Sequence, residues 1–210
     1  MPLILSHVKK SFGSHLIIDV DHFQFEHGAY WIQGSNGAGK TTLLKTIAGM
    51  LPFDGDVTWD NLDLKKDRRH YLQQVSYAPA EPLYPEFVSG KELIAFYAEA
   101  RNADSDHVNT LLSVAGVEKF ADGKAGTYST GMVKKLSLVL AFTGKPSVLL
   151  LDEPLITIDK DSVHFIYDLM HEFLDQQQGV LLFTSHQAPV ETVLPGLIKV
   201  NLVDGKIAAE

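Results

Sequence analysis

Apolar residues near the start of the chain follow the spacing of β-strands. Leu3–Val8 and Leu16–Phe25 alternate in part between apolar and polar positions, which predicts two strands. Ala29–Gln33 is a third apolar run, and it leads into a glycine-rich turn. Apolar positions at helical spacing then predict a helix over Lys40–Ala48, with Gly49 just beyond its end.

A shorter and more polar stretch follows this helix. Val57–Trp59 predicts a strand, and Asp60 and Asn61 after it predict a turn. Lys65–Gln73 has the pattern of a short polar helix, and Val75–Ala78 has that of another strand. A proline-rich loop then marks a change of character.

The middle of the chain is helical in pattern. Three helices are expected, over Gly90–Arg101, Asp106–Ala115 and Ser129–Phe142. They contain no strand-like run, so they predict a separate helical lobe.

Strand patterns return in the last third of the chain. They cover Val148–Leu151, Val180–Thr184 and Ile198–Leu202, and a long helix over Lys160–Gln178 is expected to end at Gly179. The element order predicts an α/β fold with a mixed sheet and an inserted helical subdomain. We expect one domain over 1–210, with a core of 1–78 and 146–210 and a helical subdomain of 79–145.

Composition narrows the classes of function. The net charge of −8 and the lack of a Lys/Arg-rich run argue against nucleic acid as a partner. Without cysteine, disulfides and thiolate metal sites are excluded, and a reducing cytosol is compatible. No apolar run has the length of about 18–20 residues that a membrane span needs. The sequence therefore predicts a cytoplasmic protein that reaches a membrane only through a partner.

The glycine-rich turn matches the phosphate-binding pattern G-x-x-x-x-G-K-[ST] in full, between a predicted strand and a predicted helix. Glycines let backbone N–H groups turn toward an anion at the helix N-terminus. Lys40 is expected to reach the β- and γ-phosphates of ATP, Thr41 to bind Mg²⁺ and Thr42 to contact the α-phosphate. The candidate nucleotide-binding residues here are Gly34, Ser35, Asn36, Gly37, Ala38, Gly39, Lys40, Thr41 and Thr42.

An acidic segment later in the chain supplies further candidate residues for phosphate chemistry. Val148–Leu151 is a continuous apolar run, typical of a parallel strand buried on both faces, and it ends in Asp152 and Glu153. Ligands gather at the carboxyl ends of such strands, so Asp152 is expected to hold Mg²⁺ beside the phosphate loop. Glu153 can then orient or deprotonate the attacking water. Small-molecule kinases and GTPases share the phosphate loop, but the chain lacks the Asn-Lys-x-Asp element that recognises guanine.

At this point the chain resembles the nucleotide-binding domain of the ABC ATPase family, over essentially its whole length. Tyr128-Ser129-Thr130-Gly131-Met132 resembles the family signature, usually LSGGQ, in a variant common in single-domain exporter-type subunits; a basic helical stretch, Lys134 and Lys135, follows. The resemblance implies that Ser129 and Gly131 bind the γ-phosphate of ATP held by another protomer. The plain alternative for Ser129 is an ordinary helix N-cap.

Three further residues take their roles from this resemblance. Asp159 resembles the D-loop aspartate that crosses the dimer interface, although it also fits a plain helix N-terminal acid. His186 resembles the switch histidine that contacts the γ-phosphate and holds Glu153 and water in place. Phe12 lies where the family has an aromatic that stacks on adenine; a packed strand end is the competing interpretation.

The sequence departs from the family at two loops. Ala80 occupies the place of the Q-loop glutamine, and alanine cannot ligate Mg²⁺ or hydrogen-bond water. Glu81 or a water molecule is the candidate replacement. The D-loop is also atypical, because Ile156-Thr157-Ile158 stands where small residues are usual.

The resemblance implies an ATP-hydrolysing subunit of an ABC transporter that uses ATP and Mg²⁺. Glu153, His186 and Lys40 are the expected catalytic residues, with Thr41 and Asp152 on the metal. The expected partners are a second copy or a related ATPase, and a membrane-spanning subunit docked near Pro79–Ser89, so that the protein is peripheral at the inner face of the cell membrane. A soluble ABC ATPase acting as a regulatory or assembly clamp is the alternative. A metabolic kinase would leave Tyr128–Met132 unexplained.

Overall fold

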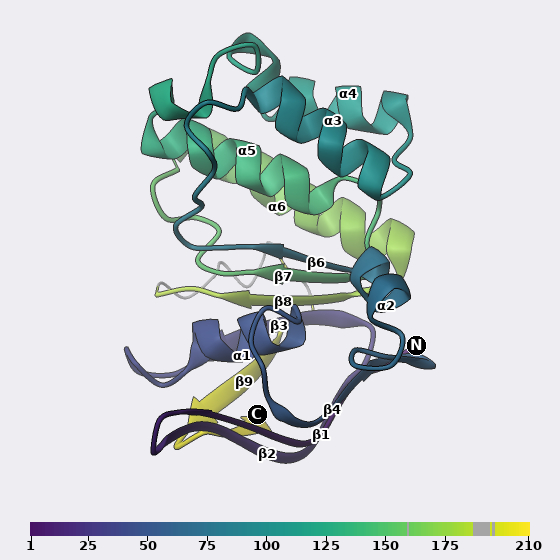
Figure 1. Cartoon of the computed structure of the whole chain (residues 1–210), viewed down its shortest axis with the longest axis vertical. Coiled ribbons are helices and arrows are strands. Elements are labelled where there is room, and N and C mark those ends of the chain that lie inside the picture. The colour runs from purple at the N-terminus through teal and green to yellow at the C-terminus, as the bar shows by residue number, and fades with distance from the viewer. Residues whose placement is uncertain (159, 187–193, 195) are drawn as a thin grey trace.

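The computed structural model describes residues 1–158, 160–186, 194 and 196–210. It arranges the chain in layers (Figure 1). A helical lobe lies at one end, a mostly parallel sheet crosses the middle, and an antiparallel sheet closes the other end. The layers place the carboxyl ends of the parallel strands at one common edge.

The central sheet has six strands in the order β10-β9-β3-β8-β7-β6. All neighbouring pairs are parallel except β9 and β10, which form an antiparallel hairpin, so the sheet is mixed as the sequence predicts. Every residue of β7 and β8 is buried, which explains their unbroken apolar runs. The strands are β3 (Gly28–Gln33), β6 (Val75–Ala78), β7 (Val148–Leu151), β8 (Val180–Thr184), β9 (Ile198–Val203) and β10 (Lys206–Ala209).

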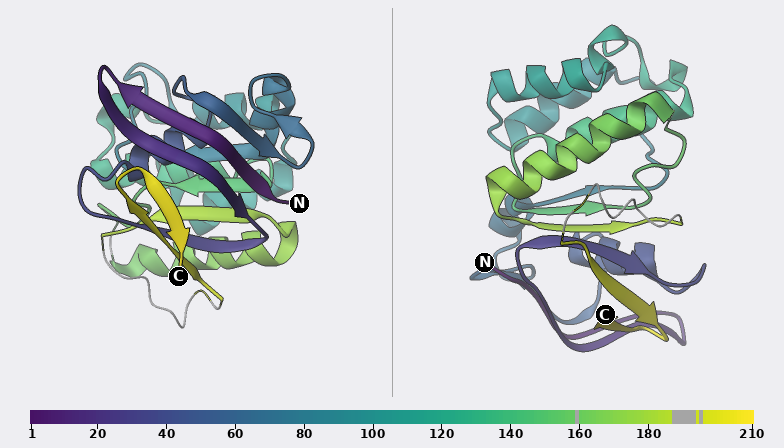
Figure 2. Two further views of the ribbon diagram at one scale, coloured as in Figure 1. Left: turned by 90° about the horizontal axis from the view of Figure 1, so that it is seen from below. Right: turned by 180° about the vertical axis from the view of Figure 1, so that it is seen from behind.

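The antiparallel sheet has the strand order β2-β1-β4-β5. Figure 2 (left) shows its long strands, β1 and β2, running side by side across that end of the molecule. Helix α1 lies between this sheet and the central one, and α2 lies beside the edge of the core (Figure 1). The bounds are β1 (Leu3–Phe12), β2 (His15–Phe25), β4 (Asp54–Trp59), β5 (Leu62–Asp63), α1 (Lys40–Ile47) and α2 (Arg68–Gln74).

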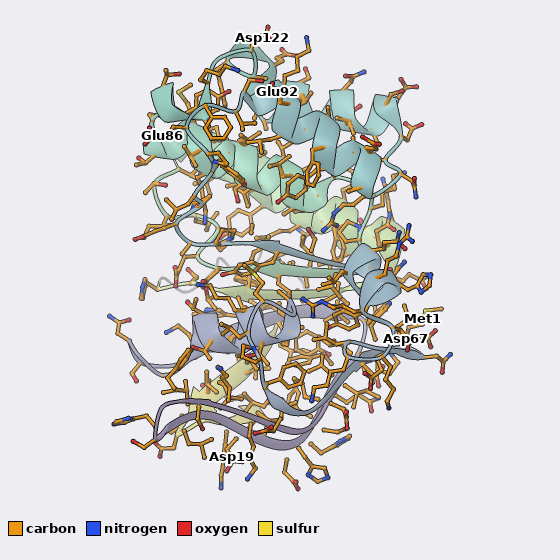
Figure 3. All side chains as sticks on the ribbon, viewed as in Figure 1. Met1, Asp19, Asp67, Glu86, Glu92 and Asp122 are labelled. Atoms are coloured by element: carbon orange, nitrogen blue, oxygen red, sulfur yellow. The ribbon has the colours of Figure 1, made fainter. Side chains whose placement is uncertain are left out.

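The lobe consists of α3 (Gly90–Ala100), α4 (Ser105–Val114) and α5 (Thr130–Phe142), with short 3₁₀ turns at Val117–Lys119 and Ala125–Thr127. Helix α6 (Lys160–Gln177) runs between the lobe and the central sheet (Figure 2, right). In Figure 3, Glu92 and Asp122 mark the end of the lobe and Asp19 the opposite end of the molecule. The proposed limits of the lobe, 79–145, stay a prediction.

The central sheet divides the apolar core in two. Leu149 and Leu151 of β7 join the cluster formed with the helices of the lobe and α6. Val148 and Leu150 alternate to the other face, where they pack with α1 and the antiparallel sheet. This alternation is the period of two that a strand imposes. The sheet is therefore held from both sides, and its carboxyl edge is a rigid base for a site.

The predicted elements are confirmed with small shifts at their ends. Strand β1 continues to Phe12, four residues beyond the predicted end, because it pairs along β2 as far as His15. Helix α6 ends at Gln177, and the left-handed residue after it is Gln178, with φ of 47°. Gly179 is needed for another reason, since a Cβ there would lie 2.3 Å from the Ser147 carbonyl oxygen.

Candidate nucleotide-binding site

A pocket of about 460 Å³ opens at the carboxyl ends of β3, β7 and β8. Its volume is in the range of small-molecule and cofactor sites. Three loops that are far apart in the sequence meet there: the loop after β3, the acidic end of β7 and the end of β8. The lining residues are Phe12, Ile17, Asn36, Gly37, Gly39, Lys40, Thr41, Thr42, Ala80, Glu81, Asp152, Glu153, Ile156 and His186.

The loop after β3 has the backbone that an anion cradle requires. Gly37 and Gly39 have φ of 81° and 102°, which side chains other than glycine rarely allow. Gly34 is constrained differently, because a Cβ there would lie 2.7 Å from the Leu202 carbonyl oxygen. Gly39 leads directly into α1, whose first N–H groups have no side-chain cap. The loop therefore offers free backbone donors to a phosphate.

Lys40 is held over this loop by the loop itself. Its ammonium donates to the carbonyl oxygens of Gly34 at 2.8 Å and Ser35 at 3.0 Å. Lys40, Thr41 and Thr42 all line the pocket, whereas Ser35 and Ala38 line an adjoining hollow together with Asn36 and Gly37. The predicted phosphate-binding segment thus lines two adjoining hollows, which share Asn36 and Gly37.

Asp152 is buried, with 2% of its surface exposed, and its carboxylate is held on both sides. Thr184 Oγ1 donates to Oδ1 at 2.8 Å, and the Tyr77 hydroxyl donates to Oδ2 at 3.3 Å. Burial, and then the charge of Asp152, raise the pKa of Tyr77, so the phenol stays protonated and remains a donor. The strands on either side of β7, which are β6 and β8, therefore set the orientation of Asp152.

Glu153 adopts a left-handed backbone, with φ of 46°, which is uncommon for a residue with a side chain. Its amide donates to Thr184 Oγ1 at 2.8 Å, so one threonine hydroxyl fixes both acids. The backbone amide of His186 donates to Glu153 Oε2 at 3.1 Å. Oε1 is buried and, among the described residues, has no hydrogen-bond partner. His186 Nε2 lies 3.7 Å from this oxygen, and the Glu153 side chain lines the pocket beside the phosphate loop.

The donor set suits Mg²⁺. Asp152 and Thr41 offer only oxygen atoms, the ligands that this cation prefers. Within the described ranges no group of three or more His, Cys, Asp or Glu side chains could hold a metal alone. A Mg²⁺ held by one carboxylate and one hydroxyl of the protein would take its remaining ligands from water and substrate phosphates.

Phe12 lies at the end of β1 with 50% of its surface exposed and lines the pocket. The Lys10 ammonium is 4.7 Å from the centroid of its ring. A half-exposed aromatic ring at the mouth of a phosphate site offers a stacking surface for a base. The exposure argues against a purely packed strand end.

Ser129 and Gly131 line a different pocket, of about 320 Å³, at the first turn of α5. The two pockets share no lining residue. Ser129 is exposed and caps α5, accepting from the Met132 amide at 3.3 Å. One chain therefore does not bring the signature residues to its own phosphate loop. Asp159, the predicted D-loop aspartate, lies outside the described residues.

Three residues of the site were missed by the sequence interpretation. Thr184 and Tyr77 hold Asp152, and Lys134 is completely buried although the sequence placed it in a basic stretch. Its ammonium donates to the carbonyl oxygens of Pro79 at 2.8 Å, Ala80 at 3.2 Å and Asp152 at 3.0 Å. The sequence offered one signal for such residues, a polar side chain within or next to an apolar run. Thr184, at the end of Val180–Thr184, is an example.

Comparison with known proteins decides the family. A sequence model described as ABC transporter matches residues 19–156, which include the phosphate loop, the signature and the acidic strand. The chain belongs to the ABC transporter family. Its fold is that of an ABC-type P-loop NTPase.

Relatives of this ABC protein are ATP-binding proteins by name. The Nod factor export ATP-binding protein I of Burkholderia lata is 30% identical over 215 residues, which cover 100% of this chain and 70% of that protein. The cytochrome c biogenesis ATP-binding export protein CcmA of Haemophilus influenzae is 34% identical over 175 residues, covering 81% of this chain and 80% of that one.

Two solved structures have the same fold. One, described as an ATP-binding subunit of an ABC transporter, superposes with a TM-score of 0.89 at 24% identity, covering 100% of this chain and 90% of that one. The other is the ATP-binding cassette MJ0796, described as a dimeric post-hydrolysis state bound to ADP and Pi, with a TM-score of 0.80 at 20% identity, covering 99% and 97%.

Proposed function

We propose that this ABC protein binds and hydrolyses ATP to drive transport through a separate membrane-spanning subunit. The observation that carries the proposal is the arrangement of Glu153, whose carboxylate is oriented by the His186 amide and lines the same pocket as the phosphate loop and Asp152. A protein that only bound nucleotide would not need a second, oriented acid there.

The residues divide the chemistry among them. The loop amides and Lys40 stabilise the charge of the β- and γ-phosphates. Thr41 and Asp152 would hold Mg²⁺, which would supply further charge neutralisation. Glu153 accepts a proton from the water that attacks the γ-phosphorus, the bond to the bridging oxygen breaks, and ADP leaves with phosphate as the second product. His186 keeps the glutamate in place.

Hydrolysis is proposed to require two chains. Ser129 and Gly131 lie at an exposed helix N-terminus, where a hydroxyl and bare N–H groups can bind an anion. Their pocket is separate from the phosphate loop of the same chain. We propose that they bind the γ-phosphate held by a second copy or a related ATPase, so that ATP joins the two chains and hydrolysis releases them.

A groove of about 350 Å³ is the proposed contact with the membrane subunit. It lies where the loop after β6 meets the lobe, and Leu83 at its rim is 92% exposed. Arg101 lines it, and its Nη1 atom is buried without a hydrogen-bond partner among the described residues. The occupant we propose is a short amphipathic segment of the membrane subunit, with apolar side chains against Leu83 and an acidic side chain that complements the charge of Arg101 in the groove lining. The described helices include none that is long and apolar enough to cross a bilayer itself.

Co-expression with the membrane-protein genes adjacent in the source genome tests the proposal. The chain should co-purify from detergent-solubilised membranes with one multi-span protein, and the complex should hydrolyse ATP faster than the isolated chain. ATP hydrolysis without recovery in any membrane fraction would favour the soluble regulatory clamp. Absence of hydrolysis in both preparations would refute the proposal.

A further inference from the structure

The buried ammonium of Lys134 touches two segments that belong to the hydrolytic site. Pro79 and Ala80 begin the loop that leaves β6 for the lobe, and Asp152 ends β7. An ammonium has three N–H donors, and each of the three has a carbonyl acceptor here. Lys134 therefore joins the loop, the lobe and the acidic strand at one point.

Packing alone does not explain a lysine at this place. The other buried side chains of α5 are mostly apolar, and an apolar residue of similar volume would fill the space without the cost of burying a charge. A lysine here instead supplies three donors, which hold three main-chain carbonyls in fixed positions.

The same helix carries the signature residues. Ser129 is the N-cap of α5, and Lys134 follows five positions later, within the continuous helix Thr130–Phe142. When the N-terminus of a short helix is displaced, the whole helix moves as a rigid body, because its backbone hydrogen bonds resist bending. The contacts of Lys134 would then transmit that displacement to Asp152 and to the loop at Ala80.

We infer that Lys134 is a positioning residue that couples the binding of a partner's nucleotide at Ser129 and Gly131 to the alignment of Asp152 and Glu153 in its own chain. The inference rests on the proposed function. It also accounts for Ala80, because in this chain the loop is tied to the site through main-chain carbonyls rather than through a glutamine side chain. Lys134 itself does not line the nucleotide pocket, so it acts only through its neighbours.

Lys134→Met tests the coupling. It keeps the length and removes the charge and the donors. Since misplacement of reacting groups by about 1 Å can cost on the order of a hundred-fold, we expect kcat for ATP to fall about ten- to hundred-fold, with KM nearly unchanged. The signature contacts persist, so the variant should accumulate the ATP-bound dimer that Glu153→Gln also accumulates. Lys91→Met makes the same change at an exposed lobe residue and should behave as wild type.

The readouts separate coupling from a loss of fold. A monomeric Lys134→Met with reduced activity, or one with wild-type kcat, would overturn the inference. If this variant does not fold, Lys134→Gln is used, which has two N–H donors for three carbonyls and a shorter reach; kcat several-fold below wild type at unchanged KM is expected, and wild-type turnover overturns the inference. Wild type and Glu153→Gln are measured in parallel, because an inactive wild type would instead refute the proposed function.

Discussion

The backbone amide of His186 donates to one carboxylate oxygen of Glu153 at 3.1 Å, and its imidazole Nε2 lies 3.7 Å from the other. The glutamate is thereby fixed by the segment after β8, while its own backbone continues from β7. Thr184, the last residue of β8, also accepts from the Glu153 amide. The end of β8 thus orients Glu153, the proposed general base, which follows the neighbouring strand β7.

His186→Ala is expected to slow hydrolysis more than it weakens binding. The imidazole contacts the glutamate and faces the pocket, whereas the phosphate loop does not depend on it. We expect kcat to fall at least about ten-fold, within the usual range for a disturbed general base, and the Kd for ATP to change little. Steady-state phosphate release and equilibrium nucleotide binding measure the two effects. His22→Ala, on exposed β2, is the matched control; a Kd effect as large as the kcat effect would count against a positioning role.

Phe12→Ala is expected to weaken ATP binding. Loss of a stacked aromatic ring is worth about 1 kcal/mol, which corresponds to roughly a five-fold higher Kd. Phe12→Trp keeps a stacking surface and should bind nearly as tightly as wild type. Fluorescent-nucleotide titration distinguishes the variants. Equal Kd values for Phe12→Ala and Phe12→Trp would show that Phe12 does not stack on adenine.

Leu83→Glu is expected to uncouple the protein from its membrane subunit. Leu83 is almost fully exposed at the rim of the proposed docking groove, so the substitution should not disturb the fold. ATP turnover of the isolated chain should stay at the wild-type level, and co-purification with the membrane protein should fall sharply. His22→Glu places a negative charge on the exposed face of β2 and serves as the control. If Leu83→Glu still co-purifies with the membrane protein, the contact lies elsewhere on the surface.

The lobe has a pH-sensitive helix cap at Ser89 and Glu92. Glu92 Oε2 accepts from the Ser89 amide at 2.7 Å, and Ser89 Oγ accepts from the Glu92 amide at 3.2 Å. The bond from the Ser89 amide, the Ser89 hydroxyl and Lys124 lower the pKa of Glu92 to about 2. Because the folded pKa is below the unfolded one, the cap stabilises fully above about pH 4.5 and the gain is lost as pH falls toward 2.

Glu92→Gln should therefore melt at a lower temperature than wild type at pH 7, and the difference should shrink through this acid range. Thermal melts followed by circular dichroism between pH 2 and 7 provide the measurement. Glu99→Gln, on the same helix, controls for the loss of one negative charge. A difference between Glu92→Gln and wild type that is independent of pH would show that the carboxylate charge does not support the cap.

The sequence was informative wherever a local pattern determines the structure. Val148–Leu151 and Val180–Thr184 were predicted with the correct ends, because strands buried on both faces leave an unbroken apolar run. The phosphate loop was recognisable because its glycines and lysine are contiguous. Lys134 was misjudged, because its burial depends on carbonyls from segments 18 and 55 positions away in the chain. No local pattern contains such contacts.

Sedimentation velocity of Glu153→Gln tests the central claim, that one chain holds half of the hydrolytic site. With ATP and Mg²⁺ the variant should shift from monomer to dimer. Adding Ser129→Asp keeps an N-cap for α5 but opposes the γ-phosphate with a negative charge, so the double variant should bind ATP and remain monomeric. A Glu153→Gln chain that stays monomeric at saturating ATP, or a dimer that is indifferent to Ser129→Asp, would contradict the account.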